Sequence, residues 1–504
     1  MQARATRGPG LEVDQARARW IWQSLSMSTL STLSTLATPV MEPVVKLSDA
    51  DLRKLDVPGP RYTSYPTADR FVEAFGHGAY AQALRQRAQG PAAGGSPPLS
   101  LYVHVPFCDS VCYFCACNKI ITKHHSRGRA YLGWLQQEVA LHVAELGANQ
   151  VVSQLHLGGG SPTFLDDHEL GDLMATLKRA FKIAPGAEQS IEVDPRTANR
   201  ERLRNLAQMG FNRISFGVQD FDHDVQVAVH RVQPFDMVQE LVAEARALQY
   251  ESINADLIYG LPRQTPESFA RTIAQVAALR PSRIALYAYA HLPQRFKPQR
   301  RINGAALPTA EQRLRMLGDA ISGFVGHGYV YIGMDHFALP DDALAIAKRQ
   351  GRLHRNFQGY STQPDADLIG LGVSSIGRVG ATYSQNAKSL PEYEDALRQG
   401  NFPVVRGLAL TRDDLLRRAV IMALMCQGRL DFESIELAHL VTFKEVFASE
   451  LTQLRELQGM GLVEVGENDI QVTATGGFFV RGIAMLFDRH LQSDQVRERF
   501  SRII

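Results

Sequence analysis

The sequence contains few cysteines and no long apolar run. Only five of its 504 residues are cysteine; four of them lie between Cys108 and Cys117, and Cys426 stands alone. A disulfide framework would spread paired cysteines along the chain, so this clustering indicates metal or redox chemistry in a reducing compartment, and we expect a cytoplasmic protein. The apolar stretch at 419–426 is far too short to span a bilayer, which argues against insertion into a membrane.

A strong charge imbalance is also absent. The formal net charge is +2, and 45% of the residues are hydrophobic and 21% charged, which is ordinary for a soluble globular protein. Nothing in this balance favours a nucleic-acid partner. Because a chain of this length exceeds what one hydrophobic core serves, we expect a main domain with one or two smaller ones.

Residues 1–45 differ from the rest of the chain. The first ten residues hold two arginines and no acid, and residues 28–36 read STLSTLSTL. Low-complexity sequence of this kind cannot build a core, so we predict a disordered extension over 1–45, followed by an N-terminal arm over 46–98. Two alternatives stay open: an organelle transit peptide, and a true start at Met27 or Met41.

From residue 99 onward, short β-branched runs alternate with helical periodicity. Such alternation is typical of a parallel sheet, either a barrel or an open sheet. Six strand–helix units are fewer than the eight of a full barrel, so we predict an α/β fold with a partial (β/α)6-type parallel barrel over residues 99–340, with its chemistry at the C-terminal strand ends. The strands are predicted at 100–105, 153–157, 190–193, 213–217, 252–258 and 283–288, and the intervening helices at 131–146, 168–181, 200–209, 235–249 and 266–279.

Past residue 400 the pattern becomes mainly helical. We predict a C-terminal helical domain over 401–504, and a segment over 341–400 that connects it to the barrel and completes the active site. The order helix, helix, hairpin suggests a winged-helix-like module, but no basic stripe accompanies the hairpin, so a structural or lid role is favoured over DNA binding. The predicted helices are 411–425 and 443–459, and the hairpin strands are 462–465 and 470–473.

The most informative segment is residues 102–117, which read YVHVPFCDSVCYFCAC. It places CxxxCxxC on a loop after a predicted strand. Thiolates are soft ligands that suit iron–sulfur clusters or zinc. Three close cysteines can bind three irons of a cubane and leave the fourth iron open to a small bidentate ligand. Zinc would need a second ligand pair at a typical spacing, so a zinc-stabilised α/β enzyme remains only the generic alternative.

Seven further motifs narrow this chemistry by resemblance. With the cysteine motif, and with Phe114 before its last cysteine, they closely resemble the oxygen-independent coproporphyrinogen III oxidase (coproporphyrinogen dehydrogenase) family of the radical S-adenosylmethionine superfamily. The resemblance runs from about residue 59 to the C-terminus. The motifs are GPRYTSYP at 59–66, HLGGGSPT at 156–163, IEVDPR at 191–196, FGVQDF at 216–221, DLIYGLP at 256–262, GMDHF at 333–337 and HRNFQGY at 354–360.

The resemblance implies a reaction and its participants. One [4Fe-4S] cluster passes an electron to S-adenosylmethionine, and the resulting 5′-deoxyadenosyl radical takes a hydrogen from a propionate of coproporphyrinogen III. Loss of CO2 and an electron leaves a vinyl group, and two such steps give protoporphyrinogen IX in haem biosynthesis. The resemblance therefore implies two S-adenosylmethionine molecules, an electron donor and an electron acceptor as partners. We expect a monomer.

The resemblance also implies roles for individual residues. Glycines after a strand let backbone approach a ligand closely, and a carboxylate within a strand is costly unless it is paired. A structural turn, a buried ion pair and a structural network under the barrel mouth are the alternatives for these positions. The implied cluster ligands are Cys108, Cys112 and Cys115; the first S-adenosylmethionine would contact Tyr102, Phe114, Gly159, Glu192 and Ile376; the second would contact Gly160, Ser161, Gln219, Arg231, Asp256 and Ala290; Cys117 and Glu192 are the catalytic candidates.

A substrate with four propionates calls for cations, because guanidinium groups pair with carboxylates. Arg61, Arg355 and Arg378 are the candidates, with a structural role as the alternative for each. Two rival functions on the same framework also stay open. One is a haem-binding chaperone, which we expect to lack the CxC extension and the GPRYTSYP arm. The other is a radical methyltransferase, cyclopropanase or haem-degrading enzyme; the motifs around Asp335 and Tyr360 favour the oxidase.

Overall fold

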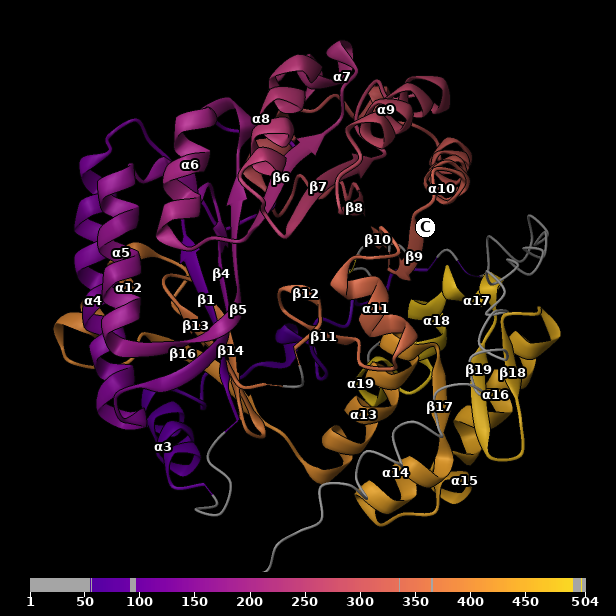
Figure 1. The fold of residues 1–504 in the computed structure, drawn as a ribbon. Helices are drawn as coiled ribbons and strands as arrows, with labels where there is room; N and C mark the ends of the chain where they lie inside the picture. The colour runs from indigo at the N-terminus through magenta and orange to yellow at the C-terminus, as the bar shows by residue number, and fades with distance from the viewer. Residues whose placement is uncertain are drawn as a thin grey trace, which may run out of the picture. The chain divides into compact units, whose positions relative to one another are not determined.

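A large mixed sheet organises the computed structural model, which describes residues 55, 57–90, 97–334, 336–363, 366–492 and 500. The predicted extension over 1–45 and Asp335 lie outside these residues. Within them the sheet has twelve strands, and its end strands, β16 and β9, do not pair with each other, so the sheet is open (Figure 1). Its order is β16 (Val404–Ala409), β15 (Thr382–Asn386), β14 (Ile376–Val379), β13 (Leu368–Leu371), β1 (Leu99–Val105), β4 (Gln150–Gly159), β5 (Phe181–Val193), β6 (Arg213–Gln219), β7 (Ser252–Tyr259), β8 (Arg283–Ala288), β10 (His336–Ala338) and β9 (Val330–Gly333).

The six predicted strands are consecutive parallel neighbours at the centre of this sheet, from β1 to β8. This confirms the α/β class and the parallel arrangement. β13 adds a further parallel strand beside β1, and β14, β15 and β16 continue antiparallel from it. At the other edge β10 pairs antiparallel with β8, and β9 with β10. Residues 368–386, within the predicted connecting segment, therefore extend the sheet.

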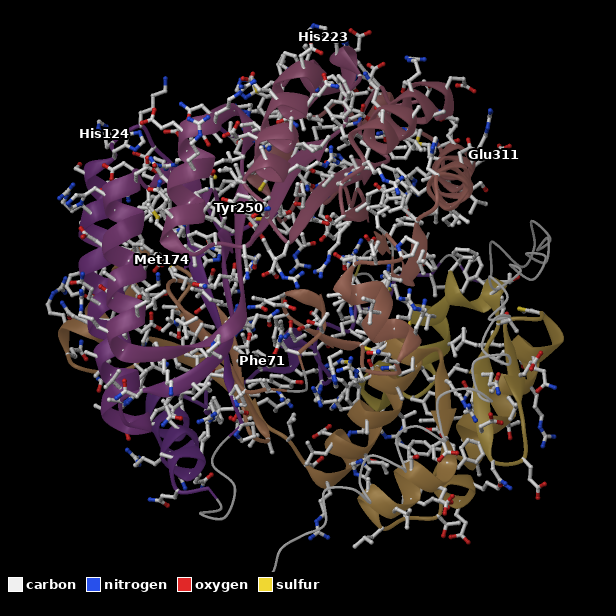
Figure 2. All side chains as sticks on the ribbon, viewed as in Figure 1. Phe71, His124, Met174, His223, Tyr250 and Glu311 are labelled. Carbon is white, nitrogen blue, oxygen red and sulfur yellow. The ribbon has the colours of Figure 1, made fainter. Side chains whose placement is uncertain are left out.

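Helices cover the outer face of the parallel strands (Figure 1). Local sequence explains their ends: a capping box joins Asp166 and Glu169 at the start of α5, and Gly210 ends α6 in the left-handed region. Met174 and Tyr250, labelled in Figure 2, belong to the apolar core beneath these helices. The helices are α4 (Ser126–Leu146), α5 (Asp167–Ala180), α6 (Arg200–Met209), α7 (His223–Ala228), α8 (Phe235–Ala247), α9 (Pro266–Leu279) and α10 (Ala310–Gly326).

The inner face of the sheet is polar. Along β6, Ile214, Phe216 and Val218 are buried in the core on one face, and Arg213, Ser215 and Gly217 alternate with them on the other. A short hairpin of β11 (His354–Asn356) and β12 (Gly359–Ser361) contacts this inner face, where the Gln154 amide lies 3.4 Å from Ser361 Oγ. Helices α11 (Ala343–Arg349) and α12 (Leu390–Arg398) lie near the two ends of the predicted connecting segment over 341–400. The strand ends that this layout gathers form the site described below.

The N-terminal arm ties the sheet to the C-terminal region. Val72 pairs with Gly407 of β16, and α3 (His77–Ala88) packs on α4. Upstream, the Tyr62 hydroxyl donates to Asp488 Oδ2 at 3.0 Å, so this part of the arm is held by the C-terminal helices.

The C-terminal region is mainly helical, as predicted. The helix predicted over 443–459 is broken at Phe447 into two helices. Three short antiparallel strands, in the order β17-β19-β18, accompany the helices, and the likeness to a winged helix stays a prediction. The elements are α13 (Arg412–Gln427), β17 (Arg429–Asp431), α14 (Phe432–His439), α15 (Phe443–Val446), α16 (Ala448–Gly459), β18 (Val463–Val465), β19 (Asp469–Val472), α17 (Ala474–Gly477), α18 (Val480–Met485) and α19 (Arg489–Gln492). None of the helices in the described part of the chain is long and apolar enough to cross a membrane.

A buried carboxylate joins α4 to the β13–β15 side of the sheet. Glu138 is 1% exposed and accepts hydrogen bonds from the Gly372 N–H (2.7 Å), the Asn386 amide (2.6 Å) and the Tyr393 hydroxyl (2.6 Å). Burial outweighs these three donors and raises the pKa of Glu138 to about 7. The native protein therefore holds a proton on this group that the unfolded chain loses at lower pH.

Glu138→Gln should flatten part of the pH dependence of stability. Below the unfolded pKa of Glu138 both states are protonated; as pH rises towards 7 only the unfolded state ionises, so the parent loses about 3 kcal/mol, and above pH 7 the loss is complete. The glutamine variant cannot ionise and should not show this loss. Denaturant unfolding of both proteins at pH 5 and pH 8 measures the difference, and parallel behaviour of the two would contradict the assignment.

Candidate functional site

The four clustered cysteines lie on a loop that follows β1. Backbone hydrogen bonds fix this loop: the Tyr113 N–H donates to the Val229 carbonyl at 3.0 Å, and the Thr122 N–H donates to the Cys108 carbonyl at 3.0 Å. Two short strands, β2 (Phe107–Cys108) and β3 (Ile120–Ile121), brace its ends. The loop is therefore held from both sides.

A pocket of about 160 Å³ opens where this loop meets the C-terminal ends of β4 to β7. Figure 2 places His124, His223 and Glu311, which precede or begin α4, α7 and α10, towards the upper edge of the view, and this is the edge at which the parallel strands end. The predicted site residues that line the pocket are Cys108, Cys112, Phe114, Cys115, Cys117, Gly159, Gly160, Ser161, Glu192, Gln219, Arg231 and Asp256.

Two arginines donate to one of the cysteines. The distances to Cys112 Sγ are 3.3 Å from Arg231 Nη1 and 3.5 Å from Arg196 Nη2. Both guanidinium groups therefore converge on one candidate cluster ligand. The hydrogen bond from Cys117 lowers the pKa of Cys115 to about 6, whereas burial raises the pKa of Cys108 to about 12.

The glycine turn after β4 lies directly against the cysteine loop. The Gly160 N–H donates to the Val105 carbonyl, and the Ser161 N–H donates to the Phe107 carbonyl, both at 2.8 Å. A Cβ atom on Gly160 would stand 2.7 Å from the Phe107 oxygen, and one on Gly159, whose φ is +116°, would stand 2.6 Å from the His104 ring. Only glycine fits at these two positions.

Glu192 occupies the centre of the pocket wall. Its carboxylate accepts from the Gly159 N–H at 3.1 Å and lies 3.3 Å from His156 Nε2. Burial raises its pKa, but the hydrogen bonds from His156 and Gly159 prevail and hold the pKa of Glu192 below its usual value. The side chain is 43% exposed, so it faces the pocket as an ionised acceptor.

The residues predicted for the second S-adenosylmethionine lie beyond Glu192. Arg231 donates to Asp194 Oδ2 at 3.1 Å and to the Gly217 carbonyl at 2.8 Å, so much of its guanidinium group is already bound. Asp256 accepts from the Ser215 hydroxyl at 2.8 Å and the Asn254 amide at 2.9 Å, and burial raises its pKa to about 6. These contacts leave Asp256 oriented towards the pocket that it lines.

Three predicted contacts are not among the pocket-lining residues. The Tyr102 ring stacks on the His156 ring, with centroids 5.8 Å apart, beside the pocket wall. The Ala290 carbonyl accepts from the Gln299 amide at 3.2 Å and lines a neighbouring pocket at the ends of β7 and β8. Ile376 pairs with Gln385 between β14 and β15.

Comparison with known proteins agrees with this geometry. The profile described as the radical SAM superfamily matches residues 102–276, and the profile described as the HemN C-terminal domain matches residues 410–479. Relatives named oxygen-independent coproporphyrinogen III oxidase include one from Pseudomonas aeruginosa, 48% identical over 459 residues, which covers 90% of this chain and 98% of the relative. The one from Escherichia coli strain K12 is 48% identical over 453 residues, covering 90% of this chain and 97% of the relative.

The chain belongs to the oxygen-independent coproporphyrinogen III oxidase family. A solved structure titled "Coproporphyrinogen III oxidase (HemN) from Escherichia coli is a Radical SAM enzyme" is 48% identical in sequence and superposes with a TM-score of 0.83, covering 88% of this chain and all of that one. Membership of the radical SAM superfamily implies a [4Fe-4S] cluster and S-adenosylmethionine.

The residues present fit such a cluster. Cys108, Cys112 and Cys115 line one pocket together with Cys117, and two guanidinium groups donate to the Cys112 sulfur. In the described part of the chain, no three His, Cys, Asp or Glu side chains are grouped closely enough to hold a single metal ion. In a cubane cluster each thiolate binds a different iron, so the cluster ligands lie further apart than the ligands of one ion. The lack of such a group therefore argues against a single-ion site, such as zinc, and not against a cluster.

Sequence reasoning missed several residues of this oxidase-family pocket. Asp194 and Arg196 belong to a quoted motif but were given no role, although Arg196 and Arg231 both pair with Asp194 beside Cys112. Their signal was the sequence DPR at a strand end, where charged groups gather around a site. The other lining residues outside the prediction are Ser110, Lys119, Val193, Ser215 and Gly217.

Gly160→Ala should displace the cysteine loop. The added Cβ would meet backbone of Pro106 and Phe107, which cannot move without the loop, and overpacking of this kind costs about 1–3 kcal/mol. We expect S-adenosylmethionine affinity to fall on the order of tenfold. Gly171→Ala, where a Cβ meets nothing within 4 Å, is the matched control. Anaerobic equilibrium binding measures both, and equal affinity for the two variants would refute the close approach.

Proposed function

We propose that this chain converts two propionate side chains of coproporphyrinogen III to vinyl groups, giving protoporphyrinogen IX in anaerobic haem biosynthesis. The observation that carries the proposal is the single pocket lined by Cys108, Cys112, Cys115 and Glu192 in a chain of this family. The curated relatives match over nearly their whole length, so the proposal concerns the same arrangement of domains.

Cys108, Cys112 and Cys115 would hold the cluster, and the pocket beside them would hold S-adenosylmethionine. When bound, these two groups supply hydrogen-abstracting radical chemistry. Arg196 and Arg231 hold the Cys112 sulfur in place by direct donation. Glu192 offers an ionised carboxylate to an ammonium or hydroxyl group, and Gly159 lets a ligand approach the backbone. The chain thus binds, orients and shields the reacting groups.

A second S-adenosylmethionine molecule is part of this proposal. Gln219, Arg231 and Asp256 supply an amide, a cation and an acid on one pocket wall, which suits an amino acid with ribose hydroxyls. Because Arg231 also donates to Cys112, Asp256→Ala is the cleaner variant. Anaerobic equilibrium binding should give two equivalents for the parent and one for Asp256→Ala. One equivalent for the parent at saturation would reject the second site.

The remaining parts of the proposal concern the setting of the reaction. We expect an electron donor for the cluster, an electron acceptor for the decarboxylation, a monomeric enzyme and a cytoplasmic location. The clustered cysteines support a reducing compartment.

The decisive experiment is an anaerobic assay of the reconstituted enzyme with coproporphyrinogen III, a reductant and S-adenosylmethionine. Air oxidation followed by chromatography and mass spectrometry should reveal a divinyl porphyrin that appears through a monovinyl intermediate. Unchanged porphyrin would reject the oxidase, and methylated porphyrin would favour a methyltransferase.

A further inference from the structure

The inner face of the sheet holds a second group of polar residues, on the side of β8 and β10. The hairpin β11–β12 reaches over this region. The Tyr360 ring lies edge-on to the His336 ring, with centroids 5.4 Å apart, and the His336 ring lies edge-on to the Tyr287 ring at 6.0 Å. The Arg61 guanidinium group stands over the Tyr287 ring at 5.5 Å. We call this the hairpin niche: Arg61, Tyr287, His336, Arg355 and Tyr360.

Arg355 has no acid partner in the niche. It is 5% exposed, its Nε donates to the Arg61 carbonyl at 3.2 Å, and its guanidinium group lies 4.6 Å from the Tyr360 ring centroid. Nη1 is buried and has no hydrogen-bond partner. No carboxylate forms an ion pair with Arg355 among the residues that the structure describes. An unpaired buried cation costs several kcal/mol, so retention of one points to an anion that arrives from outside.

Among the described residues of the hairpin niche, the two charged side chains, Arg61 and Arg355, are both cations. Burial and then the guanidinium groups of Arg355 and Arg61 lower the pKa of His336 to about 3. The His336 Nδ1 donates to the Met334 carbonyl at 2.8 Å, so the neutral ring adds no charge of its own. Asp342 is already bound by Arg283, with Nε–oxygen distances of 2.9 and 3.0 Å. The described walls of the niche are therefore aromatic, and the nearby Asp342 carboxylate is already occupied.

The niche adjoins the cofactor pocket. Asp256, which lines the pocket, is paired in register with Ala285 of β8, and Tyr287 follows two residues later on the same inner face. Tyr287 is 36% exposed, although it lies on the inner face of the sheet. Its pKa is raised by burial and then by the Asp256 carboxylate. A ligand held at Arg355 can thus reach past Tyr287 towards the pocket.

We propose that Arg355 is a substrate-positioning residue whose Nη1 binds one propionate carboxylate of the tetrapyrrole, with Tyr287 and Tyr360 as walls of the same subsite. The proposal rests on the proposed function, because it names the substrate of that pocket. A carboxylate would complete the hydrogen bonding of Nη1 and neutralise the buried charge. A planar, forked guanidinium group suits this task better than an ammonium group.

The test pairs a change in the protein with a change in the ligand. The reconstituted parent, Arg355→Gln and the exposed control Arg352→Gln are titrated anaerobically with fluorescent coproporphyrin III and with its tetraamide, which lacks the carboxylates. We expect Arg355→Gln to lose at least tenfold in affinity for the acid with little change for the amide, and Arg352→Gln to match the parent. An equal loss for both ligands would assign Arg355 a purely structural role and overturn the proposal; so would no loss for either.

Arg355→Lys keeps the proposal testable if the glutamine variant does not fold. It should bind the acid more weakly than the parent and leave the amide unaffected, with an intact cluster spectrum; acid binding equal to that of the parent would count against a forked contact. Turnover of the parent with coproporphyrinogen III separates the two proposals. A parent that turns over normally while Arg355→Gln keeps full preference for the acid rejects only the positioning role, whereas an inactive parent rejects the proposed function.

Discussion

Cys112→Ser should assemble no stable cluster and show no turnover. Cys112 is the cysteine on which Arg196 and Arg231 converge, and it is the most buried of the clustered four at 8% exposed. Serine oxygen is a hard, weakly acidic ligand that does not replace a thiolate on iron. If Cys108 and Cys115 each bind one further iron and Cys117 binds none, as we propose, no spare thiolate remains to replace Cys112.

Iron and sulfide analysis after anaerobic reconstitution measures this loss directly. Cys426→Ala is the matched control, because Cys426 is buried in the C-terminal core far along the chain from the cysteine loop. The control should assemble the full cluster. A Cys112→Ser protein with full iron content and normal turnover would be incompatible with cluster ligation by this loop.

Elements with strong local signals could be predicted from the sequence to the residue. Helix α6 begins after the Asn199 cap and ends before Gly210, and α9 begins after Thr265 and Pro266, so both were predicted with their observed bounds. Strand β8 was also predicted as observed. In each case the residues that start or stop the element lie next to it in the chain.

Elements that depend on distant partners were missed. β5 runs from Phe181 to Val193, but only 190–193 was predicted as a strand; in the structure the strand continues through Pro185 and Gly186 with a register shift against β4. Residues 368–386 were predicted as part of a connecting segment, because the pairing of β13 with β1, and of β14 and β15 beyond it, does not follow from local periodicity. Short strands gain their stability from neighbours that the sequence pattern does not reveal.

In the candidate site, too, some features could be predicted from the local sequence, and others depend on residues that are distant in the chain. Motifs at strand ends predicted the pocket wall, because parallel strands bring their C-terminal ends to one edge. The ion pair between Asp194 and Arg231, which lies outside the quoted motifs, could not be predicted. Neither could the lack of an ion-pair partner for Arg355 among the described residues. Both depend on which side chains meet after folding, and spacing along the chain does not determine this. The motif at 333–337, which favours the oxidase over its rivals, contains Asp335, and this residue lies outside the described residues.

Cys117→Ser should keep the cluster and lose turnover. Cys117 lines the same pocket as Cys115, and its thiol donates a hydrogen bond to the Cys115 sulfur, which raises the pKa of Cys117. Ligation by a fourth thiolate would occupy the iron that S-adenosylmethionine needs, and one intervening residue makes joint ligation by Cys115 and Cys117 awkward. We therefore expect the thiol to stay off the cluster, in a place where the Glu192 charge also raises its pKa.

A serine hydroxyl at this position is a far weaker acid than a thiol, so we expect turnover to fall on the order of 100-fold or more. The iron content and the absorption spectrum should match those of the parent and of Cys426→Ala. Parallel measurement of S-adenosylmethionine binding shows whether the loss lies in cofactor affinity or in the later steps, and we expect the affinity to change little. Loss of iron together with activity would instead make Cys117 a cluster ligand, and the division of roles between Cys115 and Cys117 would then have to be reversed.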